Sequence, residues 1–186
     1  GHNLGNWHAN YWACGNQTLG TNCTSRGYMD IFDVMGAFRA SHFNMIHKEK
    51  AGWINENNEI QEITNSGNYR ILPLEVQQHG IKGLKIRRDI NSSYYVEYRR
   101  KIGFDSSLYF DFHPRNLTLD GIFIHHDYPS YLYSGDTQLL DMTPGGFSWE
   151  NITTIYDVVL KGEQTFIDSN TNLRIKLISY NDSEAL

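Results

Sequence analysis

The sequence begins Gly1-His2-Asn3-Leu4-Gly5-Asn6-Trp7-His8, and these residues carry the most specific pattern in the chain. His2 and His8 lie at equal distances on either side of Gly5. Glycine tolerates positive φ, so it can turn the chain after one histidine and allow the next to return toward the same point. The spacing therefore predicts that His2 and His8 bind one metal ion.

A catalytic zinc ion has three protein ligands and one open position for water. In the metzincin signature H-E-x-x-H-x-x-G-x-x-H, two histidines share one helix face and the Glu acts as general base. His2, Gly5 and His8 match the second half of this signature. The missing half is expected upstream, in the order H-E-x-Gly1-His2, so the chain is expected to be a fragment with no catalytic Glu of its own. The absence of an initiator Met agrees with this expectation.

A second signal follows the histidines in the order that the metzincin pattern requires. These proteins have a methionine-containing turn beneath the metal, and Met35 in Asp33-Val34-Met35-Gly36 fits that place. Tyr28 stands just before this segment and is expected to pack rather than to act in catalysis. At this point the sequence resembles the gametolysin-type metallopeptidases. The similar stretches are residues 1–9, 33–36, 47–53, 94–99, 121–125 and 139–144.

The resemblance implies a function for the parent protein. His2 and His8 would bind Zn²⁺, with Gly5 and Met35 supporting the site. The parent would be a secreted zinc endopeptidase that hydrolyses peptide bonds in extracellular, cell-wall or matrix proteins or glycoproteins. The fragment alone is expected to bind zinc weakly and to be inactive, because it lacks a ligand and the general base. The alternative is a catalytically degenerate adhesion or recognition module whose β-rich part binds a glycoprotein or peptide.

The composition is compatible with both functions and disfavours others. The chain has 186 residues, is 40% hydrophobic and carries a net charge of -5. Its short basic runs, residues 87–88 and 99–101, do not form the cationic stripe of a nucleic-acid surface. No apolar run is long enough to span a membrane.

Two features favour an extracellular location. Cys14 and Cys23, the only cysteines, bracket a short polar loop, and a disulfide between them is expected to constrain the rim of the site. N-glycosylation acceptor sequences occur more often than chance predicts. They lie at Asn16, Asn22, Asn91, Asn116, Asn151 and Asn181.

The pattern of apolar residues predicts an α+β chain with a change near residue 54. Residues 1–54 would be the C-terminal part of a metzincin catalytic domain, with the end of the ligand helix, the methionine turn and a helix over 40–50. Residues 55–186 would form an antiparallel, sandwich-like all-β domain, entered through a polar linker at 55–59. The expected strands cover residues 69–76, 83–88, 93–100, 121–126, 138–142, 164–168 and 173–179.

The remaining histidines are expected to have structural roles. His42 and His47 would lie on the exposed side of the predicted helix. His125 and His126 are neighbours in a predicted strand, where successive side chains point to opposite faces. We therefore expect one of that pair in the core and the other in solvent.

Overall fold

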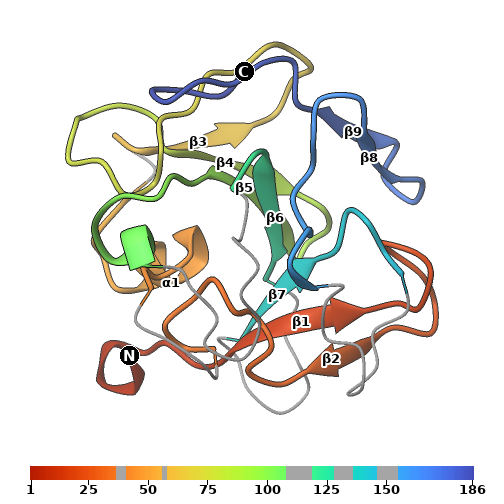
Figure 1. Ribbon diagram of the computed structural model, residues 1–186. Coiled ribbons are helices and arrows are strands. Elements are labelled where there is room, and N and C mark those ends of the chain that lie inside the picture. The colour runs from red at the N-terminus through yellow and green to blue at the C-terminus, as the bar shows by residue number, and fades with distance from the viewer. Residues whose placement is uncertain (37–40, 56–57, 108–118, 128–135, 146–154) are drawn as a thin grey trace.

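The computed structural model of the chain describes residues 1–36, 41–55, 58–107, 119–127, 136–145 and 155–186. Its main element is a mixed seven-stranded sheet in the order β2-β1-β7-β6-β5-β4-β3, beside a two-stranded hairpin, β8-β9 (Figure 1). The strands are β1 (Ala9–Ala13), β2 (Thr24–Arg26), β3 (Ile60–Ile63), β4 (Gly83–Arg87), β5 (Ser93–Tyr98), β6 (Ile122–His126), β7 (Thr137–Leu140), β8 (Thr165–Asp168) and β9 (Leu173–Lys176). The helical elements are η1 (His2–Leu4), α1 (Met45–Lys50) and η2 (Gly103–Ser107).

The β-rich character expected from the sequence is present, but the sheet is not purely antiparallel. The pairs β1-β7 and β3-β4 are parallel, whereas the other neighbouring pairs of the sheet are antiparallel. Because β1 pairs with β7, the sheet joins strands from both sides of residue 54 (Figure 1). The strand pairing therefore does not separate the residues expected to form two domains.

At β6, in the middle of the sheet, successive side chains point to opposite faces, and both faces are covered by apolar residues. On β6, Phe123 packs with Phe32 and Leu139 in one apolar cluster, while Ile122 and Ile124 belong to another. The second cluster also contains side chains from the C-terminal segment. Consequently β6 is buried along its whole length.

Helix α1 is shorter than the helix expected over residues 40–50. Its N-cap is Asn44, whose side chain accepts a hydrogen bond from the backbone N–H of His47 at 3.0 Å. An Asn side chain in this position satisfies an amide that has no partner within the helix, so it fixes where the helix begins. Residues 41–43 therefore precede the helix, and Ala40 lies outside the described residues.

The strand expected over residues 69–76 was wrong, and the strand β3 was not expected. Residues 69–76 form only isolated bridges, Ile71 with Ala185 and Pro73 with Tyr98, since Pro73 has no N–H for a ladder. Conversely, β3 lies at an edge of the sheet just after the expected linker, and its central side chains are exposed. An edge strand of this kind lacks the apolar alternation that would have revealed it.

Candidate metal site

Gly5 has the conformation that the histidine spacing requires. The short helix η1 ends at Gly5, which has φ 81° and donates its N–H to the carbonyl of His2 at 3.0 Å. A Cβ at this position would meet no atom within 4 Å. Gly5 is therefore needed for its backbone conformation and not for space, because left-handed φ is strained for other residues.

The His2 imidazole is held by a neighbour in its own loop. Its Nδ1 lies 2.9 Å from the carbonyl oxygen of Asn6. A carbonyl can only accept, so Nδ1 carries the proton and Nε2 keeps its lone pair. This is the arrangement found in metal-ligating histidines, where the second nitrogen donates to a carbonyl or carboxylate.

His8 is anchored through its backbone at the start of β1. Its N–H donates to Oδ1 of Asp136 at 3.0 Å, and its carbonyl accepts from the N–H of Thr137 at 3.1 Å. The ring centroids of His2 and His8 lie 5.3 Å apart with an interplanar angle of 78°. Two imidazoles bound to one tetrahedral zinc, each with Zn–N of about 2.1 Å, have centroids about 5 Å apart. The separation of the two rings is therefore compatible with a common zinc ion, and it is also that of an edge-to-face ring contact.

Met35 lies against the beginning of the chain. A Cβ added to Gly1 would collide with the Sδ of Met35, and the carbonyl of Met35 accepts a hydrogen bond from Ala9 N–H at 3.2 Å. The methionine therefore sits next to the segment that carries His2 and His8. Gly36, the next residue, has no room for a side chain, because a Cβ there would collide with the carbonyl oxygen of Asp30.

The segment from Tyr28 to Gly36, here called the methionine turn, is shaped by two buried aspartates. Asp30 Oδ1 accepts from Phe32 N–H at 3.0 Å, and Asp33 Oδ1 accepts from Met35 N–H at 2.6 Å. Such side-chain to backbone bonds are the standard way in which Asp closes a turn. No local pattern of residues indicated that these carboxylates would be buried.

Each aspartate also pairs with a buried histidine. Asp30 Oδ2 lies 2.9 Å from Nε2 of His125, and Asp33 Oδ2 lies 2.9 Å from Nδ1 of His47. Burial alone would raise the pKa of Asp33, but His47 and the amide donors of Asn44 and Met35 hold that pKa below its usual value. Burial would lower the pKa of His125, yet Glu97 and Asp30 together raise it.

Arg99 ties the methionine turn to the sheet. Its buried guanidinium donates to the carbonyl of Phe32 at 2.7 Å and lies 3.2 Å from Glu75. It also donates to Asp105 and lies 3.6 Å from Glu97. A buried charge needs such partners, since removing it from water costs several kcal/mol by itself.

Two expectations about histidines were therefore wrong. His47 is fully buried, because its ring turns inward to Asp33, whereas helical periodicity placed it outside. His125 and His126 are both buried, because each face of β6 is covered. His42 is partly buried and packs edge-on against Phe104.

Tyr28 lies at the site, as its position before the methionine turn suggested. Its ring centroid is 4.1 Å from that of His8, and its backbone has φ 63°, which is uncommon for a residue other than glycine. Asn10 holds this conformation through a hydrogen bond from Tyr28 N–H to Oδ1 at 2.9 Å. The contact with His8 is one of packing, in agreement with the expected role.

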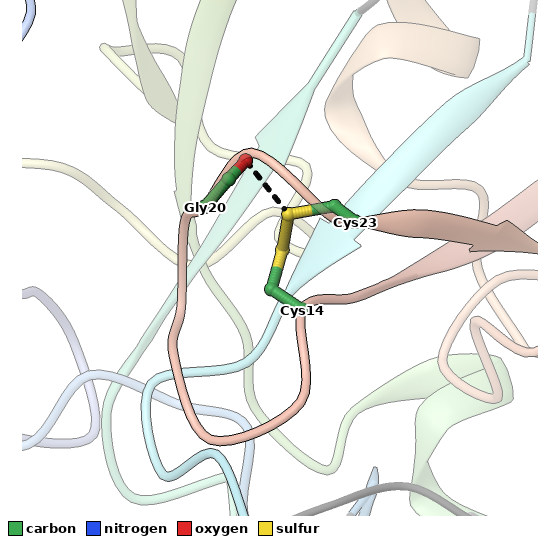
Figure 2. Close-up of a disulfide and its surroundings, with 3 residues drawn as sticks. All are labelled: Cys14, Gly20 and Cys23. Atoms are coloured by element: carbon green, nitrogen blue, oxygen red, sulfur yellow. Dashed lines mark hydrogen bonds between the residues drawn. A yellow bond between two sulfur atoms is a disulfide. The ribbon is translucent and has the colours of Figure 1, made fainter.

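Cys14 and Cys23 form the expected disulfide, which closes the loop between β1 and β2 (Figure 2). The Cys23 sulfur contacts the carbonyl oxygen of Gly20 at 3.1 Å. Closing a loop of this length stabilises the fold by about 2.7 kcal/mol in the chain-entropy treatment. The disulfide therefore joins the end of β1, which begins directly after His8, to the start of β2.

The described part of the chain contains no cluster of three or more His, Cys, Asp or Glu side chains that could hold a metal. Within the same residues, no helix is long and apolar enough to cross a membrane. Comparisons of the chain with protein-family models, with curated proteins and with solved structures found no match.

Proposed function

We propose that this chain carries the C-terminal part of the catalytic domain of a secreted, metzincin-like zinc endopeptidase. The observation that carries the proposal is the convergence of His2 and His8, whose ring centroids lie 5.3 Å apart across the turn at Gly5. The Asn6 carbonyl, by accepting from Nδ1 of His2, leaves Nε2 as the nitrogen that can bind metal. Met35 lies beside Gly1, next to the segment that carries His2 and His8.

In this proposal each residue has a defined task. His2 and His8 supply two of the three ligands, and the third ligand and the general base come from the upstream H-E-x segment. A zinc ion held there supplies an activated water and polarises the peptide carbonyl of the substrate. Gly5 sets the direction of residues 1–8, here called the ligand loop, and Met35 packs beneath this loop.

The secretory location is supported by the disulfide and by the exposure of the acceptor asparagines. Asn16, Asn22, Asn91 and Asn181 are all exposed, as glycosylation requires, whereas Asn116 and Asn151 lie outside the described residues. A disulfide persists in oxidising compartments and is rare in the cytosol. A substrate among extracellular proteins or glycoproteins follows from this location.

The experiment has two steps. The transcript is first sequenced on the 5′ side of Gly1, where we expect codons for His-Glu and one further residue. The parent protein is then assayed on a denatured protein substrate, with and without the upstream Glu→Gln substitution. The proposal expects hydrolysis that is lost with the substitution or with a zinc chelator. Any other residues upstream, or activity that survives the substitution, would contradict it.

A second candidate function, recognition of a glycoprotein or peptide, is favoured by a cavity of about 520 Å³. Trp12, His126 and the ion pair of Arg88 with Asp168 line it, next to the disulfide loop. Burial lowers the pKa of His126 to about 4, so its imidazole is neutral at physiological pH. An aromatic ring beside neutral and paired polar groups suits an uncharged sugar or a peptide.

This candidate is separable from the protease by mutation. Trp12→Ala is expected to weaken the binding of a glycopeptide and to leave zinc binding unchanged. Binding that does not respond to this substitution would remove the support for the second function.

A further inference from the structure

Asn6 occupies an unusual place in the ligand loop. It is fully buried, while Gly5 and Trp7 on either side are exposed. Its side-chain Nδ2 donates to the carbonyl of His47 in α1 at 3.1 Å, and its own carbonyl accepts from His2 Nδ1. The residue that orients His2 is therefore itself fixed to a distant helix.

The contacts continue from α1 into the methionine turn. The His47 ring donates from Nδ1 to Asp33 Oδ2 at 2.9 Å, and the other Asp33 oxygen accepts from Met35 N–H at 2.6 Å. Met35 then accepts through its carbonyl from the N–H of Ala9, the residue after His8. The hydrogen bonds thus start at one candidate ligand, pass through α1 and the turn, and return beside the other.

We infer that Asn6, His47 and Asp33 are positioning residues that fix the tautomer and direction of the His2 imidazole, an inference that rests on the proposed zinc site. The helix η1 has only three residues, too few to hold its shape by itself. His2 is also exposed, and among its contacts with Trp7, His8 and Asn6 the bond to the Asn6 carbonyl is the one that distinguishes the two ring nitrogens. Loss of the Asn6 side-chain bond would free the Asn6 backbone carbonyl to move. Loss of the His47 ring would detach from Asp33 the helix whose backbone carbonyl holds Asn6. In either case His2 would lose its preferred orientation.

The first readout does not require metal. In the metal-free chain, ¹⁵N NMR of the histidine rings reports which nitrogen carries the proton. We expect the neutral His2 ring of the wild type to carry its proton on Nδ1. We expect Asn6→Leu to give the mixture of tautomers of a solvated imidazole. Leucine preserves the side-chain size, and Asn6 Oδ1 has no partner among the described residues, so this substitution removes only the bond to His47.

The second readout is the zinc dissociation constant of the same proteins. Loss of an outer-shell partner typically weakens metal binding by about 10–100-fold, and we expect a change of that size for Asn6→Leu and His47→Leu. His47→Asn places an amide donor where Nδ1 lies, so it should restore most of the affinity. His126→Leu is the matched control, because it removes an equally buried histidine that lies outside this chain of contacts.

The outcomes separate the two proposals. An unchanged His2 tautomer together with an unchanged zinc affinity in Asn6→Leu and His47→Leu would overturn the inference while leaving the zinc site intact. The His2 tautomer could also change in Asn6→Leu while His2→Ala leaves the zinc affinity unchanged. This result would support the positioning role and refute the proposed metal site. Equal losses in His47→Leu and His126→Leu would assign the effect to general destabilisation and overturn the inference.

Discussion

The ligand loop, residues 1–8, and the methionine turn, residues 28–36, meet at the candidate site but are built in opposite ways. The loop is mostly exposed, and its conformation depends on a few hydrogen bonds such as that of His2 to the Asn6 carbonyl. The turn is mostly buried, and Asp30 and Asp33 hold it through both backbone amides and histidine rings. The comparison indicates that the proposed ligands lie in a segment held by few hydrogen bonds, while buried contacts fix the neighbouring turn to the rest of the molecule.

The largest effect on stability is expected when the guanidinium that fixes the turn to the sheet is removed. Arg99→Met leaves Asp105, Glu75 and Glu97 buried without their cation. Breaking a buried pair in this way costs about 3–5 kcal/mol, measurable as a lower free energy of unfolding in urea. Arg70→Met, which disrupts an exposed pair with Glu184, should change that free energy by less than about 1 kcal/mol. Equal effects of the two substitutions would contradict the role given to Arg99.

A smaller loss is expected when the disulfide is removed. Replacing Cys14 and Cys23 together by Ala should lower the free energy of unfolding by about 2.7 kcal/mol. The wild-type chain treated with a reducing agent should show the same loss. If the double variant keeps its zinc affinity, the disulfide between β1 and β2 contributes to stability and not to zinc binding.

Gly5→Ala tests the exposed loop directly. The positive φ at Gly5 should cost the variant about 1–2 kcal/mol of stability. Gly15→Ala is a close match, because Gly15 has φ 68° and equally open surroundings. Both variants should lose similar stability, but only Gly5→Ala should lose zinc affinity in calorimetric titration. Loss of zinc affinity in both variants would show that backbone strain away from the histidines is sufficient to weaken zinc binding, and it would contradict the specific role given to Gly5.

The smallest expected effect is a pH dependence of the histidine under the turn. Because Glu97 and Asp30 raise the pKa of His125 in the folded protein, the charged ring stabilises the fold fully below the unfolded pKa of about 6.5. This stabilisation is lost as the pH rises through the raised folded pKa. The difference in urea midpoint between wild type and His125→Gln should therefore shrink from pH 5 to pH 9. A difference that stays constant with pH would show that the charge of His125 makes no contribution to the stability of the fold.

The sequence predicted the exposed half of the site better than the buried half. His2, Gly5 and His8 follow a spacing that has a direct physical meaning, and the positive φ at Gly5 agrees with it. The partners of Met35 were not foreseen, since nothing local shows that Asp33 will meet His47 across a helix. Periodicity assigns a polar helical residue to solvent, and only the tertiary contact reverses that assignment.

The same limit applied to the sheet. Alternating apolar residues identified most of β4 to β9, because such strands carry their signal within themselves. The parallel pairing of β1 with β7 joins distant parts of the chain and depends on tertiary contacts that no local pattern reports. The expectation of an antiparallel domain over residues 55–186 failed at the parallel pair of β3 with β4.

The measurement that tests the central claim most directly is a zinc titration of the chain followed by NMR of its histidine rings. The account predicts that the resonances of His2 and His8 shift together and saturate at one zinc per chain, while those of exposed His79 do not move. His2→Ala or His8→Ala should abolish the response of the remaining ring. Independent responses of the two rings, or none from either, would contradict a shared metal site.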